Sequence, residues 1–233
     1  MLVGMAKGGL PMVGMLSVPL LSLVIPPVQA AGLLLPIYVA SDVFGVIAYR
    51  RAWDGRVLAI LIPGMTAGVV LGWLAASVTP ERVVTLLVGA IGAAFALVTL
   101  LRRAPDGPPR QPRLVPGLFW GAVTGFTSFV SHAGAPPYQV YVLPMRLDKA
   151  VYAGTTTLTF AFVNAIKLPP YWALGQLNPA NLTLAAALMP LAAAAVWLGV
   201  WLVRVLPARQ LFALVTWSLL AVSVKLIWDG LAG

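Results

Sequence analysis

Two apolar segments of this chain are each interrupted by residues that break helices. The first contains Lys7–Pro11 (Lys-Gly-Gly-Leu-Pro), and the second, about half a chain later, contains His132–Pro137 (His-Ala-Gly-Ala-Pro-Pro). Broken backbone at membrane depth is tolerated only where it is buried in protein or lines a polar cavity. Matched Gly/Pro interruptions in the two halves of a chain point to the substrate site of a transporter. These segments therefore predict a pair of broken helices that face one polar site.

The composition places these segments in a multi-pass membrane protein. Of the 233 residues, 61% are hydrophobic and only 9% are charged, whereas a soluble domain carries about a quarter charged residues. The net charge of +9 comes from Lys and Arg scattered in short loops, which is typical of membrane orientation signals and not of a nucleic-acid surface. The absence of cysteine excludes disulfides and thiolate chemistry. With one histidine and six acidic residues, the sequence predicts no metal site, cofactor or catalytic carboxylate pair.

Six uninterrupted apolar ranges are each long enough to cross a bilayer as a helix, which takes about 20 residues. They are 28–49, 57–77, 82–101, 149–167, 180–203 and 208–229, and the interrupted ranges are 1–24 and 116–146. Between the halves lies a polar linker at 102–115, rich in Arg and Pro. The predicted fold class is therefore an all-α polytopic membrane protein.

The two halves look like copies of one unit. Pro63, Gly72 and Pro80 recur at a constant offset of 127, and Asp42 aligns with Asn164 at a slightly smaller offset. This predicts an N-terminal repeat over 1–101 and a C-terminal repeat over 116–233, joined by a cytoplasmic linker at 102–115. Each repeat would hold one broken helix and three full spans.

The basic residues favour re-entrant hairpins for the broken segments. If both segments turn back inside the membrane, only Arg82, Lys167 and Lys225 fall on the less basic side. Full crossings would spread the charges more evenly, and the stronger bias is the one expected of cytoplasmic loops. Three crossings per half would then make the two repeats inverted.

Each broken segment has a functional and a structural interpretation. Lys7 beside the start of the next helix would form an anion site, because helix N-termini attract negative charge; alternatively, the glycines serve packing and Lys7 reaches the surface. His132, the single histidine, could complete a polar pocket with Ser128, Ser131 and Tyr138, or could be a hydrogen-bonded packing residue.

Asp42 lies near the middle of the span at 28–49. A charge at that depth costs at least ~2.5–3.5 kcal/mol on insertion scales, so the carboxyl must be protonated, paired or hydrated. Its repeat partner Asn164 is followed one turn later by Lys167. Two interpretations stay open: an ion pair with Lys167 or His132, and a carboxylate that couples transport to protons.

At these motifs the chain resembles the TauE/SafE-type sulfite exporters. The resemblance rests on Lys7–Pro11 followed by Pro19, and on His132–Pro137 followed by Gly154-Thr155 and Asn164–Lys167, with Ala135 where the family usually has a second glycine. It covers essentially the whole chain. It implies transport of small sulfur-containing anions, such as sulfite or organosulfonates, across the inner membrane.

The sequence therefore predicts a secondary anion transporter that is not an enzyme. Its site, between the two hairpin tips near the membrane midplane, would bind the anion through one set of residues: Lys7, Gly8, Gly9, His132, Gly134, Pro136, Tyr138, Asn164 and Lys167. Asp42 or His132 would carry a coupling proton. Three alternatives remain: a passive anion channel, an intramembrane enzyme that uses His132, and a non-transporting assembly partner. The oligomeric state is left open, with a homodimer as one option.

Overall fold

The computed structural model describes residues 1–7, 11–101, 108–205 and 208–232, and every regular element within them is helical. The elements in chain order are α1 (Leu2–Lys7), α2 (Pro11–Gly14), α3 (Ser17–Leu21), α4 (Pro27–Tyr49), α5 (Gly55–Val78), α6 (Glu81–Leu101), α7 (Leu114–Ser131), α8 (Ala135–Val142), the 3-10 turn η1 (Leu143–Met145), α9 (Lys149–Ala173), α10 (Pro179–Val205) and α11 (Ala208–Ala232).

The six ranges predicted as uninterrupted spans are confirmed as the helices α4, α5, α6, α9, α10 and α11. Their starts follow ordinary helix chemistry. The Asp54 carboxylate accepts hydrogen bonds from the backbone N–H groups of Arg56 and Val57 at the start of α5, and α4 and α10 begin with proline. Within the described residues, five helical stretches are long and apolar enough to cross a membrane: α4, α5, α6, α7 and Val215–Ala232 of α11.

The interruption predicted at His132–Pro137 is confirmed, because α7 ends at Ser131 and α8 begins at Ala135. The interruption predicted at Lys7–Pro11 falls on residues 8–10, which lie outside the described part. Later in that first apolar segment, α2 ends at Gly14 and α3 begins at Ser17. The Tyr141 hydroxyl donates to the Arg113 carbonyl at 2.9 Å, and the Arg110 N–H donates to the Pro144 carbonyl at 2.9 Å. The start of α7 therefore lies beside the end of α8, and the two helices form a hairpin with the break at its tip.

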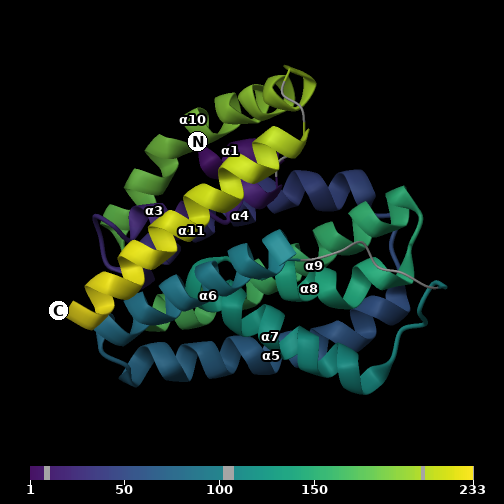
Figure 1. Cartoon of the computed structure of the whole chain (residues 1–233), viewed down its shortest axis with the longest axis horizontal. Coiled ribbons are helices and arrows are strands. Elements are labelled where there is room, and N and C mark those ends of the chain that lie inside the picture. The colour runs from purple at the N-terminus through teal and green to yellow at the C-terminus, as the bar shows by residue number, and fades with distance from the viewer. Residues whose placement is uncertain (8–10, 102–107, 206–207, 233) are drawn as a thin grey trace.

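Helices from the two halves of the chain pack against one another in pairs. α5 packs on α7, α1 on α10, α4 on α9, and α6 on α11. Figure 1 shows α10 along one edge of the molecule and α5 with α7 along the opposite edge, with α4 between them. The central position of α4 and α9 brings the middle of α4 next to the α7–α8 tip.

Glycines let α5 and α7 approach until their backbones touch. Gly64, Gly68 and Gly72 repeat every fourth residue on α5, as do Gly117, Gly121 and Gly125 on α7. A Cβ atom at Gly68 would overlap the Ala122 carbonyl oxygen, and one at Gly125 would overlap the Met65 carbonyl oxygen. Small residues at this spacing are the usual means of close helix packing in membranes, where burial of apolar surface adds little.

We expect Gly68→Ala to destabilise the protein by about 1–3 kcal/mol, because the new methyl group has no space against the α7 backbone. Alanine's higher helix propensity, about 1 kcal/mol, only partly offsets this. Thermal unfolding of the purified protein in detergent measures the effect. The matched control is Ala67→Leu on the exposed side of the same helix, expected to stay within about 0.5 kcal/mol. Equal midpoints for the two variants would contradict this account of the α5–α7 contact.

Candidate functional site

A fully buried lysine binds the broken end of α7. Lys167 on α9 has no exposed side-chain surface. Its ammonium donates to the Ser128 carbonyl oxygen and to the Ser128 hydroxyl, each at 3.1 Å, and lies 2.7 Å from Nδ1 of His132. A helix C-terminus leaves carbonyls without intrahelical donors and carries partial negative charge. The Ser128 carbonyl also accepts from the His132 N–H, so Lys167 adds a second donor at the negative end of α7, where the chain breaks.

The hydrogen bonds of His132 define its protonation pattern. Because the Lys167 ammonium can only donate, Nδ1 of His132 accepts. Nε2 then carries the proton and donates to the Ala31 carbonyl oxygen of α4 at 2.9 Å. The imidazole is thus neutral beside the ammonium, and a second positive charge at 2.7 Å would be strongly unfavourable. Lysine and histidine together can therefore hold one positive charge but not two.

His132 also forms the turn that separates α7 from α8. Its φ of 54° is left-handed, a conformation that residues other than glycine seldom adopt and that clusters at functional sites. The next helix begins at Ala135, and Pro136 and Pro137 have no N–H to offer. The N–H groups of Gly134 and Ala135 are therefore the donors at the start of α8.

Tyr38 connects the two broken segments. Its ring centroid lies 4.7 Å from that of His132. Its hydroxyl donates to the Gly14 carbonyl of α2 at 3.1 Å and lies 3.2 Å from the Ser17 hydroxyl of α3. Sequence reasoning missed this residue, although Tyr38 is one helical turn before Asp42 and so shares its face of α4.

Asp42 and Asn164, predicted as repeat partners, are in direct contact. The Asn164 amide donates to the Asp42 carboxylate at 2.6 Å, and both side chains are buried. Asn164 lies one helical turn before Lys167 on α9. The buried lysine and the buried carboxyl group are therefore parts of one polar region between α4 and α9.

Some of the other predicted site residues lie in the described part of the chain and the rest lie outside it. Tyr138 is buried, but its hydroxyl lies 3.0 Å from that of Thr156, and its ring packs on Tyr152 and Phe160. Pro136 is in the first turn of α8. Lys7 ends α1, while its side chain, together with Gly8 and Gly9, lies outside the described residues.

These contacts weaken the case for His132 as a catalytic base oriented by Asp42. In a Ser-His-Asp arrangement the Nδ1–H of histidine donates to a carboxylate. Here Nδ1 accepts from an ammonium, Nε2–H donates to a backbone carbonyl, and Asp42 accepts from Asn164. The Ser131 hydroxyl donates to the Thr127 carbonyl of its own helix.

Several helices that are long and apolar enough to cross a membrane, together with a buried lysine at a helix break, are typical of multi-pass membrane transporters. The family model "Sulfite exporter TauE/SafE" matches residues 1–226, and the chain belongs to this family. The resemblance seen in the motifs is thereby confirmed. No curated protein and no solved structure matches the chain.

A double-mutant cycle measures the contact between Asp42 and Asn164. We expect Asp42→Leu and Asn164→Leu to show a coupling free energy of about 1.5–3 kcal/mol, because the bond is charge-assisted and buried. Thermal unfolding of the two single variants and the double variant gives this value. Asp42→Leu combined with Lys225→Ala, at an exposed residue of α11, is the control and is expected to be additive. Additivity for Asp42 with Asn164 would contradict the contact.

Proposed function

We propose that this protein is a secondary transporter of small sulfur-containing anions, such as sulfite or organosulfonates, in the inner membrane. The observation that carries the proposal is the buried Lys167 ammonium, whose hydrogen bonds end on the uncharged groups of Ser128 and His132. An oxyanion that replaced these acceptors would form charge-assisted hydrogen bonds, which are about twice as strong. The sulfur chemistry of the anion rests on the family.

The anion would lie at the tip of the α7–α8 hairpin, between Lys167 and the start of α8. The N–H groups of Gly134 and Ala135 lie at the N-terminus of α8, which is the positive end of its dipole and favours negative charge. His132 and the α4 residue Tyr38 would line one side of this anion site. Lys7, Gly8 and Gly9 of the first broken segment, and Pro136 and Asn164, remain proposed contributors to the same site.

Reciprocal packing supports an inverted repeat with the predicted boundaries, 1–101 and 116–233. α5 packs on α7 as its counterpart α10 packs on α1, and α5 contacts α9 as α10 contacts α4. A Cβ atom at Gly32 of α4 would meet Gln176, just beyond α9, and one at Gly154 of α9 would meet Ala52, just beyond α4. The predicted partners Asp42 and Asn164 contact each other, as residues beside a two-fold axis would.

The basic loops support an orientation with the hairpin mouth toward the cytoplasm. The Asp54 N–H donates to the Thr155 hydroxyl at 2.9 Å, so the α4–α5 connection lies beside the start of α9. The mouth of the α7–α8 hairpin leads directly into α9. Basic residues gather in these connections: Arg50, Arg51, Arg56, Arg110, Arg113, Arg146 and Lys149. Such an excess is typical of cytoplasmic loops, and it supports the predicted cytoplasmic position of the 102–115 linker.

Transport would couple to protons through Asp42, with His132 as the second candidate. Asp42 contacts Asn164, which lies one helical turn before Lys167 on α9, so protonation of the Asp42 carboxyl would change the charge balance around a bound anion. Rocking of one repeat against the other would expose the site alternately to the two sides.

We expect sulfite, thiosulfate or a small sulfonate to raise the unfolding midpoint of the purified protein, and Lys167→Met to abolish that increase. His132→Ala and Lys7→Ala should weaken it, because each removes a group proposed to contact the anion. Lys225→Met, which removes an exposed lysine of α11, is the matched control and should keep the full increase. Unchanged stabilisation in Lys167→Met would place the site elsewhere, and no anion giving stabilisation would favour a non-transporting role.

Asp42→Asn separates binding from proton coupling. We expect this variant to retain anion-dependent stabilisation but to lose anion accumulation driven by a pH gradient in proteoliposomes, because the amide cannot take up the coupling proton. Wild-type protein in the same vesicles is the reference. A large ohmic anion conductance in wild-type protein would instead identify a channel, and normal accumulation by Asp42→Asn would shift the coupling role to His132.

A further inference from the structure

We propose that Tyr171 is the gate of a solute pathway that runs from an open cleft at the end of the molecule opposite the hairpin mouth to Lys167. The identity of the solute rests on the proposed function, whereas the pathway and its gate rest on the cavities and contacts below.

A polar cleft opens where α4 and α6 begin and α5 and α9 end. Its volume is about 480 Å³. The polar side chains that line it are uncharged except for one carboxylate, and they are Gln29, Thr79, Glu81, Gln176, Asn178 and Asn181. A cleft of this size and polarity would be filled with water and could admit a small hydrophilic solute.

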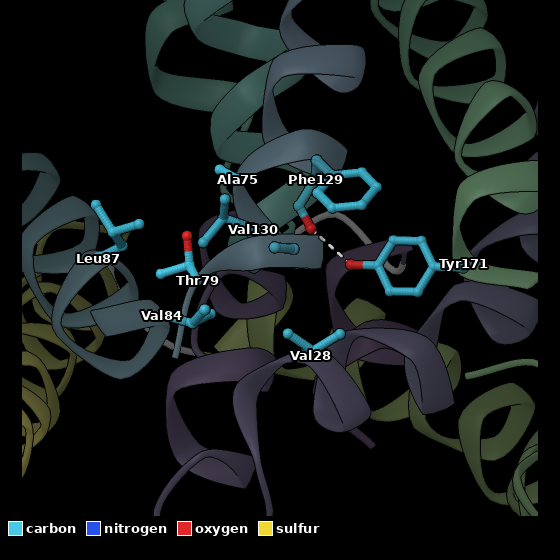
Figure 2. A pocket seen from close by; sticks show the side chains of 9 residues that line it. Val28, Ala75, Thr79, Val84, Leu87, Phe129, Val130 and Tyr171 are labelled. Atoms are coloured by element: carbon cyan, nitrogen blue, oxygen red, sulfur yellow. Dashed lines mark hydrogen bonds between the residues drawn. The ribbon is translucent and has the colours of Figure 1, made fainter. Parts of the chain in front are cut away.

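An apolar neck continues from the floor of this cleft. The neck has a volume of about 10 Å³, which is about the space needed for one water molecule. It shares four lining residues with the cleft: Val28, Ala76, Thr79 and Val84. Its inner wall is formed by Phe129, Val130 and Tyr171, and Figure 2 shows the Tyr171 hydroxyl directed at the Phe129 backbone oxygen.

Tyr171 lines this neck and lies one helical turn after the buried lysine on α9. Its side chain is 1% exposed, and its hydroxyl donates to the Phe129 carbonyl at 2.6 Å. Lys167 lies one helical turn earlier on the same face of α9 and donates to Ser128, the neighbour of Phe129. Two side chains of α9 therefore donate hydrogen bonds to the last turn of α7. Tyr171 is the outer one, nearer the cleft, and Lys167 is the inner one.

The Tyr171 hydrogen bond can keep the neck closed and can also be released. The neck is otherwise lined almost entirely by apolar side chains, so a hydrated anion cannot pass while it is this narrow. The Tyr171 bond ends on a carbonyl that the helix itself leaves free near its end, and breaking it disrupts no helical hydrogen bond. Rotation of one side chain would therefore widen the neck and join the cleft to Lys167.

Because the chain contains no cysteine, single introduced thiols can test the gate in the full-length protein. Asn178→Cys reports on the cleft, and Ser128→Cys reports on the inner side, where the native hydroxyl contacts Lys167. The probe is 2-sulfonatoethyl methanethiosulfonate, a small anionic thiol reagent, and mass spectrometry follows its reaction with the detergent-solubilised protein.

We expect fast labelling of Asn178→Cys with or without the gate substitution, and slow labelling of Ser128→Cys. Tyr171→Phe should accelerate labelling of Ser128→Cys about three- to tenfold, because it removes only a hydrogen bond, whose net worth corresponds to that factor. Tyr171→Ala should accelerate it further by also removing the ring. If Tyr171→Ala fails to fold, Tyr171→Phe alone still decides the outcome.

The matched control is Tyr49→Ala, at an exposed tyrosine of α4. It should not change the labelling rate of Ser128→Cys. Unchanged labelling in both Tyr171 variants, or equal acceleration by Tyr49→Ala, would overturn the gate. Since labelling needs no transport, a protein that binds no anion could still show the gate, and the two proposals fail separately.

Discussion

The contact on which the rest of the site depends is the one between the Lys167 ammonium and the last turn of α7. A helix that ends inside the apolar region exposes carbonyl oxygens that have no water to bind. Near this end the Phe129 carbonyl accepts from Tyr171, and the Ser128 carbonyl accepts from Lys167 as well as from the His132 N–H. The Lys167 ammonium also orients His132, which in turn reaches α4 through Ala31. One buried lysine thus binds the broken end of α7 and links three helices.

A rigid frame surrounds this contact. The backbone-to-backbone approach at Gly68 and Gly125 joins α5 to α7 along most of their length. Side chains cannot slide past each other easily where backbones touch, so α7 is held more firmly along its length than at its end. Changes in the site are therefore expected to occur in side chains such as Tyr171 and in the hairpin tip, where hydrogen bonds and not backbone contacts hold the structure.

The two halves are alike in packing but differ in chemistry. The reciprocal helix pairs match, yet the partner of the anionic Asp42 is the neutral Asn164, and the single histidine belongs to the second half. A polar region with one carboxylate and one ammonium can hold a near-neutral charge balance while empty. An arriving anion, or a proton on Asp42, would shift that balance, which is the property that coupled transport requires.

The sequence by itself determined the membrane class, the uninterrupted helices and the position of the break at His132–Pro137. Apolar runs of sufficient length, proline at helix starts and Gly/Pro clusters act locally and need no knowledge of distant contacts. His132, Asn164, Lys167 and Asp42 could also be selected, because polar side chains are costly in apolar segments. The protein family was recognisable from the two Gly/Pro motifs and these polar residues.

Only the tertiary structure decided which of these residues meet. Lys167 contacts His132 and Ser128, Asn164 contacts Asp42, and Tyr138 is directed to Thr156. Tyr38 and Tyr171 have no unusual signature in an apolar sequence, because a tyrosine there is ordinary until its hydroxyl reaches a free carbonyl. The two interrupted segments, which first indicated a polar site, are joined through the Tyr38 ring and hydroxyl. Such pairings depend on how α4, α7 and α9 cross, and that geometry follows from long-range packing that no local pattern encodes.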